Sequence, residues 1–330
     1  MRDEDTEIDM QKVTTLPWQT GTTPLMLAPM QGLTNRALRG YFIEQVRPDV
    51  IFTEFMRVKA GAAIPLLPAD LRDIAPEQDG VPLVVQLVGH GRDLLVAAAR
   101  TAQEAGARHI NLNMGCPYGR MGGGLTGGGM LRAPEDLTEI IPALREAIHG
   151  SFSVKVRSGY DAPDQILALL PLFEASGVDF LVLHPRTVVQ KYDAPADHRV
   201  TARVVGETRL PVIANGDVLT AADGRRLLAE TGAAGLMLGR GAIADPLLFS
   251  RLRSEATPEP GHEEQRRELG RFLWEMMNRY GQLFCGDTQV LQKLKEIIAY
   301  QDDPELAKLF KPLKRAKSLR DFEAALAGLD

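Results

Sequence analysis

Short apolar runs rich in branched side chains recur along the chain, and a longer segment with helical periodicity follows each of them. Such near-continuous apolar runs are typical of strands that are buried on both faces of a parallel sheet. We expect each run to form a strand. The runs are Leu25–Met30, Ile51–Phe55, Leu83–Gly89, His109–Gly115, Phe152–Ser158, Phe180–Pro185, Pro211–Asp217 and Gly235–Gly241.

The segments between these runs have the start and stop signals of helices, as in Arg92–Ala105, Pro134–Ile148 and Ala221–Glu230. Pro134 is followed by two acidic residues, and Gly232 comes just past the third segment. Eight strand-then-helix units predict fold class α/β, a (β/α)8 TIM barrel. A doubly wound sheet is the alternative, but it usually has fewer strands and a glycine-rich phosphate fingerprint after the first strand, which this chain lacks.

The length of 330 residues leaves room for a barrel of ~250 residues and one smaller domain. We expect a flexible extension over residues 1–20, the barrel over 21–253, and a linker over 254–262, where Pro, Glu and Gly are frequent. Residues 263–330 have helical periodicity and no strand candidate, so they predict a C-terminal all-helical domain.

Composition narrows the compartment and the partners. The acidic N-terminus lacks the apolar stretch of a signal peptide, and no apolar run is long enough to cross a membrane. The two cysteines, Cys116 and Cys285, are far apart in sequence, which argues against a disulfide framework and for the cytoplasm. A net charge of −5 argues against binding nucleic acid by bulk electrostatics, so any RNA site has to be a local basic patch.

Polar residues stand at the predicted carboxyl ends of nearly all the strands. In a barrel of this kind the functional groups lie at that end. Scattered structural polar groups are the alternative to one shared site. The residues are Gln31, Glu54, Gln86, Asn113, Lys155, His184, Asn215, Asp217 and Arg240.

Lys155 lies between Val154 and Val156 in a strand that is predicted to be buried. A buried ammonium is costly unless it meets an anion or loses its proton. We interpret Lys155 as a cation that faces the electron-rich edge of a reduced flavin; a Schiff-base lysine and a buried ion pair are the alternatives. Gln86 has the donor and acceptor needed to recognise a flavin edge, and His184 could contact flavin or substrate.

Two glycine-containing turns follow the last two strands, Asn215-Gly216-Asp217 and Gly239-Arg240-Gly241. Barrels commonly hold a phosphate at these two loops. Glycine lets the backbone approach a phosphate closely, and an arginine adds charge-assisted hydrogen bonds. The pattern favours a phosphorylated cofactor, for which flavin mononucleotide (FMN) is suitable; glycines that serve only tight turns are the alternative.

The fourth strand leads to Cys116 and then to a glycine-rich segment, 119–129, which we expect to form a mobile flap over the barrel mouth. Free cysteines are usually buried and inert, but the position of Cys116 at the base of this segment makes it a candidate catalytic residue. Cys285 has no such context and is assigned no role. The histidines and cysteines do not group at ligand spacings, so no metal site is predicted.

At these residues the chain resembles the tRNA-dihydrouridine synthase family (Dus), from about residue 25 to its end. Thr53–Val58 and Gly286-Asp287-Thr288 are most similar to the C-type subfamily, which acts on position 16 of the tRNA D-loop. Pro185 departs from the family, where glycine is commoner. The matching segments are Ala28–Met30, Thr53–Phe55, Gln86–Gly89, Asn113–Pro117, Val154–Arg157, His184–Thr187 with the later Tyr192, Val212–Asp217 and Gly239–Gly241.

The resemblance implies that NADPH or NADH reduces a bound FMN, and that a uridine in the tRNA D-loop then becomes 5,6-dihydrouridine. The flavin N5 hydride would go to C6 of the extruded uridine while Cys116 protonates C5. FMN contacts are implied for Pro29, Met30, Gln31, Gln86, Lys155, Asn215, Gly216, Asp217, Gly239 and Arg240, with His184 close by. Contacts to tRNA are implied for Arg57, Asn113, Tyr192, Lys293, Lys295, Tyr300 and Lys314.

A basic run between Lys293 and Arg320 is interpreted as the tRNA-binding surface of an otherwise acidic protein. A solvated helix face is the alternative. Two other functions stay open. One is an FMN barrel that acts on a small molecule such as dihydroorotate, which leaves the basic run unexplained. The other is a non-catalytic RNA-binding flavoprotein. No obligate protein partner is predicted.

Overall fold

The computed structural model describes residues 16–117, 124–254, 260–301 and 303–329. Most of the predicted extension over 1–20 and of the predicted linker over 254–262 lies outside the described residues, as does part of the glycine-rich segment 119–129. The domain boundaries therefore stay a prediction.

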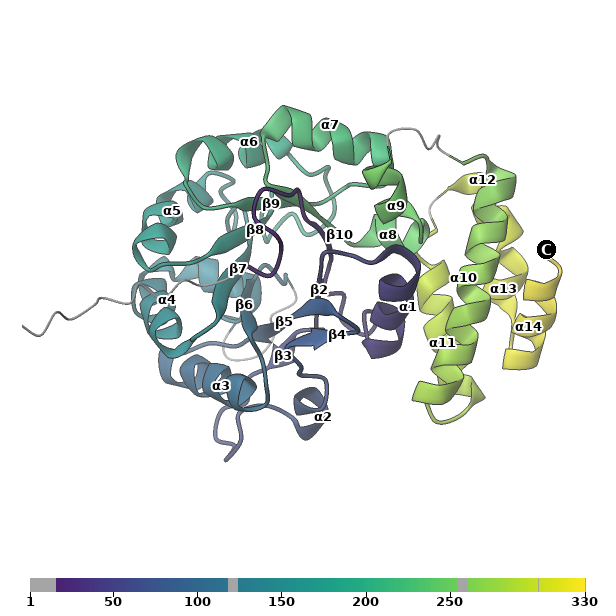
Figure 1. The fold of residues 1–330 in the computed structure, drawn as a ribbon, viewed down its shortest axis with the longest axis horizontal. Coiled ribbons are helices and arrows are strands. Elements are labelled where there is room, and N and C mark those ends of the chain that lie inside the picture. The colour runs from purple at the N-terminus through teal and green to yellow at the C-terminus, as the bar shows by residue number, and fades with distance from the viewer. Residues whose placement is uncertain (1–15, 118–123, 255–259, 302, 330) are drawn as a thin grey trace, which may run out of the picture.

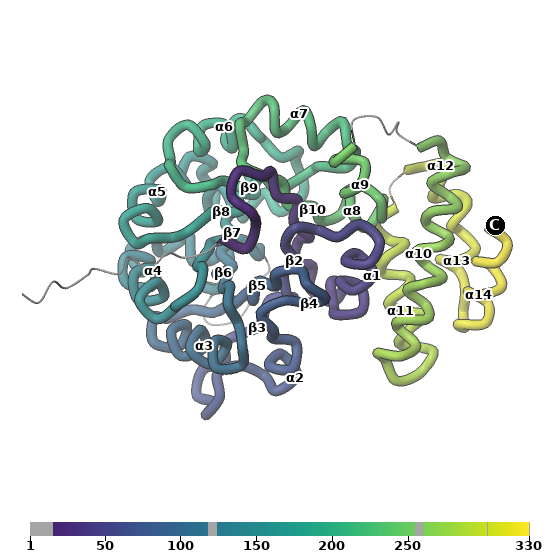
Figure 2. The backbone as a smooth tube through the Cα atoms, in the orientation of Figure 1, coloured from purple at the N-terminus to yellow at the C-terminus, as the bar shows by residue number. Residues whose placement is uncertain are grey.

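Eight parallel strands close into a barrel, as the sequence predicts (Figure 1). The first strand closes the ring, because Leu25 pairs with Leu236 of the last strand and Met26 pairs with Val50 of the second. Figure 2 shows this closure as the purple N-terminal segment beside the green one. The strands are β1 (Leu25–Leu27), β2 (Val50–Phe52), β5 (Val81–Val88), β6 (His109–Met114), β7 (Ser151–Arg157), β8 (Phe180–His184), β9 (Val212–Asn215) and β10 (Gly235–Leu238).

Helices surround the strands and connect one to the next. They are α1 (Arg36–Val46), α3 (Arg92–Glu104), α4 (Pro134–Ala147), α5 (Gln165–Ala175), α6 (His198–Glu207), α7 (Ala221–Thr231), α8 (Arg240–Ala244) and α9 (Leu248–Arg253). Short elements that the periodicity does not predict lie in the loops, because two to six residues are too few to show a period. They are β3 (Met56–Arg57), α2 (Pro68–Leu71), β4 (Glu77–Gln78) and η1 (Gly127–Arg132).

All eight predicted strands end earlier than expected, by one residue in β5, β6, β7 and β8 and by two or three in β1, β2, β9 and β10. The last two corrections concern the phosphate-loop candidates. Pro211–Asp217 is a strand only over β9, because Gly216 and Asp217 adopt left-handed backbone angles, with φ of 125° and 53°. Gly235–Gly241 is a strand only over β10, and Arg240 already begins α8. Gly216, Asp217 and Gly239 therefore lie just beyond the strand ends, whereas Asn215 is the last residue of β9 and Arg240 is the first of α8.

The described C-terminal residues form five helices that lie beside α1 and α8 in Figure 1. The prediction of a helical C-terminal region is confirmed. Among the described residues, no helix is long and apolar enough to cross a membrane. The helices are α10 (His262–Leu283), α11 (Asp287–Ile298), α12 (Pro304–Leu309), α13 (Lys311–Arg315) and α14 (Leu319–Ala327).

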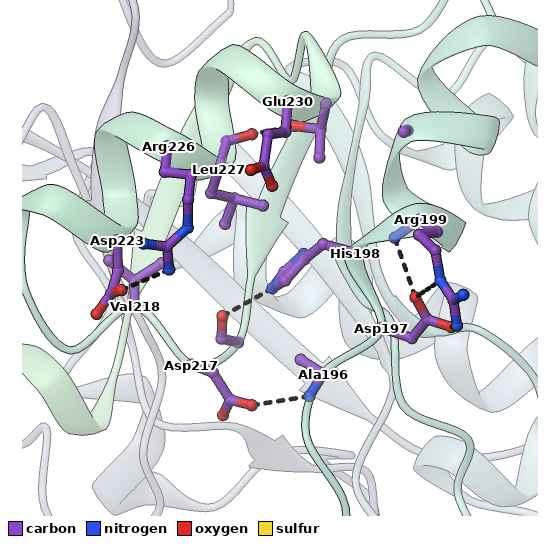
Figure 3. Close-up of a pocket in the computed structure, with 13 residues that line it drawn as sticks. Ala196, Asp197, His198, Arg199, Asp217, Val218, Asp223, Arg226, Leu227 and Glu230 are labelled. Atoms are coloured by element: carbon purple, nitrogen blue, oxygen red, sulfur yellow. Dashed lines mark hydrogen bonds and ion pairs between the residues drawn. The ribbon is translucent and has the colours of Figure 1, made fainter.

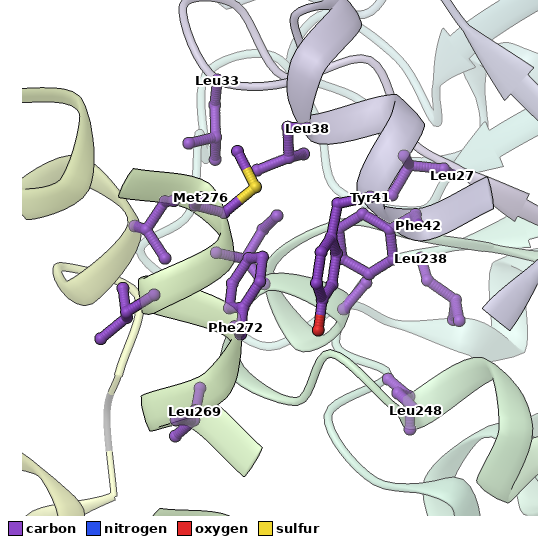
Figure 4. Packing of buried hydrophobic residues seen from close by; sticks show 14 of the residues in the cluster. Leu27, Leu33, Leu38, Tyr41, Phe42, Leu238, Leu248, Leu269, Phe272 and Met276 are labelled. Atoms are coloured by element: carbon purple, nitrogen blue, oxygen red, sulfur yellow. The ribbon is translucent and has the colours of Figure 1, made fainter. Parts of the chain in front are cut away.

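One apolar cluster continues from the barrel into the C-terminal helices (Figure 4). Phe272 of α10 is fully buried, and its ring centroid lies 4.7 Å from that of Tyr41 and 6.1 Å from that of Phe42, both on α1. Arg251 of α9 adds an ion pair to Glu268 of α10, with 2.5 Å between nitrogen and oxygen. This packing holds the helical region against the part of the barrel that contains β1 and β10.

Phe272→Ala is expected to lower the free energy of unfolding by about 3–5 kcal/mol, because it leaves a cavity between α1 and α10. Trp274→Ala is the matched control, since this residue lies on the same helix and is 41% exposed. We expect the control to cost less than about 1 kcal/mol. Urea unfolding of both variants measures the difference, and equal losses would contradict the central position of Phe272.

Candidate active site

Closure of the barrel brings the polar residues at the strand ends together. Lys155, at the end of β7, donates from Nζ to Oδ1 of Asn215, at the end of β9, over 2.9 Å. Met30 and Gly239 also meet at the mouth, since a Cβ added to Gly239 would lie 3.6 Å from the Met30 sulfur. The candidates from β1, β7, β9 and β10 thus lie around one barrel mouth.

Lys155 is a partly buried cation whose only described partner is an amide oxygen. Among the described residues, no carboxylate lies within ion-pairing distance of its Nζ, so the alternative of a buried ion pair finds no partner. The pKa of Lys155 falls from its ordinary value of 10.5 to about 8, mainly because the side chain is buried and secondly because Arg157 carries a like charge nearby. Lys155 is therefore charged at neutral pH but is held at a cost.

A chain of side-chain amides crosses the interior of the barrel and ends at Cys116. Gln86 donates to Oδ1 of Asn111 over 2.8 Å and accepts from Nδ2 of Asn113 over 2.9 Å. Oδ1 of Asn113 in turn accepts from the backbone N–H groups of Gly115 and Cys116, both over 3.0 Å. Asn113 therefore caps the turn that carries Cys116, a role that the sequence does not indicate.

The glycines that follow Cys116 allow the chain to pack closely against it. The N–H of Gly128 donates to the Cys116 carbonyl over 3.0 Å, and a Cβ added to Gly127 would lie 3.1 Å from the Cys116 Cβ. Gly127, with φ of 58°, and the next two residues are buried in η1. In this described part of the expected flap, the glycines serve close packing.

Four cations surround His184 and one carboxylate holds two of them. Burial, followed by the charges of Lys155, Arg157, Arg186 and Arg240, keeps the pKa of His184 well below its ordinary value. His184 is therefore neutral, and its Nε2 lies 3.1 Å from Nη1 of Arg186. Asp217 is the only carboxylate that pairs with these cations among the described residues, so three positive charges are left in excess.

Asp217 binds its partners with both oxygens. It accepts from Arg186 over 2.6 Å, from Arg240 over 2.8 Å and from the N–H of Ala196 over 2.8 Å. Burial alone would raise the pKa of Asp217, but these donors outweigh it and leave the pKa below its ordinary value. Because its carboxylate is occupied in this way, Asp217 orients the two arginines.

Tyr192 presents an aromatic ring beside these cations. The side chain is 47% exposed, and the guanidinium carbons of Arg157, Arg186 and Arg240 lie 5.2, 6.0 and 5.1 Å from the ring centroid. Cations at such distances are attracted by the electron-rich face of the ring. The mouth therefore combines positive charge with an accessible aromatic surface.

Arg157 and Arg186 are missing from the candidates that the sequence suggests, although both lie in the segments quoted for the resemblance. Arg157 is 1% exposed and Arg186 is 4% exposed. The available signal was the position of Arg157 two residues after Lys155, within one apolar strand. A charged residue at a strand end is ordinarily solvated, so the sequence did not indicate that Arg157 is buried. Its burial results from the closure of the barrel.

The predicted tRNA contacts have different surroundings. Lys293 donates to the Gly32 carbonyl over 2.5 Å and to Glu296 over 2.7 Å, which ties α11 to the loop after β1. Lys295 donates to the Ala316 carbonyl over 2.5 Å. Tyr300 is partly buried, and Lys314 and Arg57 are exposed.

A cavity of about 330 Å³ lies beside the mouth, between α6 and α7 (Figure 3). His198 and Asp217 line it, and the His198 Nε2 lies 3.0 Å from the Gly216 carbonyl. Neither Lys155 nor Cys116 lines this cavity, which shares Gly216 and Asp217 with the barrel mouth.

The residues present at the mouth are suited to a phosphorylated flavin. The loops after β9 and β10 are neighbours, since Met237 pairs with Asn215. A Cβ added to Gly216 would come within 3.1 Å of His184, so only glycine leaves this loop its close approach. Lys155 offers a cation without a carboxylate, and Arg240 offers a second one at the phosphate loop. This donor set matches an anionic ring edge and a phosphate.

Comparisons with known proteins identify the family of the chain. A family model described as "Dihydrouridine synthase (Dus)" matches residues 26–326. A probable tRNA-dihydrouridine synthase from Rhodobacter capsulatus is 36% identical over 226 residues, which are 68% of each chain. A tRNA-dihydrouridine(16) synthase from Cupriavidus necator is 31% identical over 318 residues, which are 92% of this chain and 97% of the relative.

Solved structures support the fold. Morphinone reductase in complex with tetrahydroNAD has a TM-score of 0.50 at 14% identity, over 73% of this chain and 90% of that one. A variant of NCR from Zymomonas mobilis has a TM-score of 0.51 at 16% identity, with the same coverage of both chains. At these identities the likeness concerns the barrel fold alone.

Lys155→Met is expected to raise the free energy of unfolding of the cofactor-free protein at pH 7. We expect an increase of about 2 kcal/mol. The variant no longer buries a charge, which is favourable, and the lost hydrogen bond to Asn215 offsets part of this gain. Because the pKa of Lys155 falls from 10.5 in the unfolded chain to about 8, the folded wild type binds fewer protons than the unfolded one between these values. Wild type therefore gains stability as the pH rises through this window, and the advantage of the variant disappears.

Urea unfolding at pH 7 and near pH 10.5 measures this difference. Lys59→Met, at an exposed lysine, is the control and is expected to change little at either pH. An advantage of Lys155→Met that is the same at both pH values would show that the charge of Lys155 is not the cause.

Proposed function

The chain belongs to the dihydrouridine synthase family, and we propose that it reduces a uridine in the D-loop of tRNA to 5,6-dihydrouridine, with FMN as cofactor and NADPH or NADH as reductant. Several relatives are named as synthases for position 16, including those from Cupriavidus necator and Haemophilus influenzae. We infer the same position for this protein.

The excess of positive charge at the barrel mouth is the observation that carries the proposal. Lys155, Arg157, Arg186 and Arg240 gather around His184, and among the described residues only Asp217 pairs with any of them, in a protein whose net charge is −5. Such a local excess attracts anions even on an acidic protein. A cofactor phosphate and an RNA backbone are the anions that the proposed reaction brings to this place.

The chain's own residues have separate tasks in the reaction. Bound FMN supplies the hydride that C6 of the uracil accepts. Cys116 gives a proton to C5, as a positioned general acid. Asn113 holds the turn of Cys116 in place through its two backbone hydrogen bonds. The cation of Lys155 stabilises negative charge at the ring edge of the cofactor, in a site from which neighbouring side chains exclude much of the water.

A uridine in folded tRNA has to leave its stack before it can reach Cys116. The exposed ring of Tyr192 offers a surface for a base, and the guanidiniums around it offer charge for phosphates. We propose that Tyr192 contacts the RNA next to the extruded base.

The helical region offers a second basic surface. Exposed cations of α13, α14 and the residues between them have no ion pair among the described residues, whereas Lys308 pairs with Glu305. We propose that they contact the tRNA backbone. Lys293 and Lys295 already donate to carbonyls of the protein, so they contribute positive charge to this surface but few free hydrogen-bond donors. The unpaired cations are Lys311, Lys314, Arg315, Lys317 and Arg320.

Cys116→Ala is expected to reduce dihydrouridine formation at least about 100-fold, because it removes the proton donor. The measurement is dihydrouridine content, position by position, in tRNA from cells that lack the protein and then receive wild type or variant. Cys285→Ala is the matched control, at an exposed cysteine in the helical region, and is expected to restore the modification.

The proposal is supported if wild type and Cys285→Ala restore dihydrouridine at one D-loop position and Cys116→Ala does not. Equal restoration by Cys116→Ala would remove Cys116 from the reaction. Unchanged dihydrouridine at every position in a host without a redundant synthase would point to a flavin barrel that acts on a small molecule, which activity on free pyrimidines would then establish.

Lys314→Ala is expected to weaken tRNA binding at low salt and to lower the slope of log affinity against log salt by about 1, because one phosphate contact is lost. Arg100→Ala is the control, at an exposed cation on α3, on the side of the barrel away from the C-terminal helices (Figure 1). Filter binding over a salt series measures both. An affinity that does not depend on salt, or equal losses in the two variants, would contradict the assignment of this surface.

A further inference from the structure

We propose that Arg157 is a positioning residue, which holds the turn of Cys116 and the loop of Tyr192 in one fixed arrangement. The role rests on the proposed function, since it concerns the placement of the proton donor against the RNA-facing ring. Arg157 lies at the carboxyl end of β7, and its side chain is 1% exposed.

The guanidinium of Arg157 binds three backbone carbonyls from two separate loops. Its Nε donates to the carbonyl of Gly115 over 2.9 Å. Its Nη1 donates to the carbonyls of Thr187 and Lys191, each over 2.7 Å. The first carbonyl precedes Cys116 in the chain, and the last one precedes Tyr192.

The turn of Cys116 is therefore held from two sides. Asn113 accepts from the N–H groups of Gly115 and Cys116, while Arg157 donates to the Gly115 carbonyl. With both kinds of backbone group bound, this turn has little freedom to rotate. The direction in which the thiol points follows from the backbone that carries it.

The loop of Tyr192 is held by the same side chain. Lys191 has a left-handed backbone with φ of 49°, which is unfavourable for a residue with a Cβ. The carbonyl of this residue accepts from Arg157, and the guanidinium carbon lies 5.2 Å from the centroid of the Tyr192 ring. Arg157 thus contributes to keeping an unfavourable loop conformation that presents Tyr192 to solvent.

Only arginine can make this set of contacts. Its planar fork directs several donors at once, whereas a lysine offers one ammonium on a flexible stem. Among the described residues, no carboxylate pairs with Arg157, and the acceptors of these three hydrogen bonds are neutral carbonyls. A cation that served only to balance charge would not need three such partners.

Arg145 provides a matched control at the other end of the barrel. It also donates to two carbonyls, those of Ile148 and Gly150, and to the carboxylate of Asp179. These partners precede β7 and β8, at the amino ends of the strands. Loss of the Arg145 contacts disturbs the barrel wall without reaching Cys116 or Tyr192.

The test separates the two half-reactions of the FMN-loaded protein. Arg157→Met and Arg157→Lys are expected to slow the tRNA-dependent reoxidation of reduced flavin by about tenfold or more, because the proton donor is no longer held in place. Bleaching of the flavin by NADPH, which does not use Cys116, is expected to keep its rate in Arg157→Lys, which preserves the positive charge at the mouth. Arg145→Lys is expected to leave both rates unchanged.

A second readout does not depend on turnover. In the Cys285→Ser background, Cys116 is the only cysteine, and its alkylation by iodoacetamide can be followed by mass. We expect Arg157→Lys to speed this alkylation severalfold, because the turn is loosened, and Arg145→Lys to leave it unchanged. Arg157→Lys keeps a cation in the barrel wall, so it can be used for the test if Arg157→Met does not fold.

Three results would overturn the inference: wild-type reoxidation in Arg157→Lys, equal slowing of both half-reactions, or an unchanged alkylation rate. The first would mean that charge alone matters, and the second that Arg157 only supports the fold. If wild type itself shows no tRNA-dependent reoxidation, the proposed function fails, and the alkylation rate still decides the role of Arg157.

Discussion

Repulsion among the cations gathered at the barrel mouth is the constraint on which the arrangement of the site depends. The parallel barrel brings Lys155, Arg157, Arg186 and Arg240 close to His184, and Asp217 alone among the described residues opposes them with a full charge. Like charges in a poorly solvated place raise the free energy of the folded state. The protein limits this cost by hydrogen-bonding each cation to carbonyls, amides or Asp217. An anionic ligand would remove the remaining repulsion, and the free energy released in this way would contribute to its binding affinity.

The helical region is connected to this mouth through one loop. Gly32 follows the predicted flavin contacts Met30 and Gln31; its N–H donates to Glu54 over 2.7 Å and its carbonyl accepts from Lys293 of α11 over 2.5 Å. Below this loop, the aromatic packing of Phe272 against α1 holds the same two regions together. A helical region that is packed in this way has a defined position relative to the mouth. A ligand that contacts both regions would therefore meet them in one defined relative orientation.

The fold follows from the sequence more directly than the site does. Periodic apolar runs predict the eight barrel strands and the helices between them, because burial on both faces of a sheet acts on every residue of a strand. The ends of β9 and β10 are predicted too long, since the left-handed backbone of Asp217 and the start of α8 at Arg240 depend on partners far away in the sequence. The role of Arg157 is hidden for the same reason, because its carbonyl partners lie 30 to 42 residues from it in the chain.

Net charge is a poor guide to the partner of this protein, and the pairing of its cations is a better one. On the barrel helices, cations such as Arg203 and Arg226 are neutralised by neighbouring carboxylates. On α13 and α14, exposed cations such as Lys314 have no ion pair among the described residues. Acidic residues elsewhere on the protein account for the net charge of −5. They do not cancel the positive potential at α13 and α14, because salt screens interactions between exposed charges that are farther apart than a Debye length of about 8 Å. An acidic protein can therefore present two positive regions, one at the barrel mouth and one on the C-terminal helices.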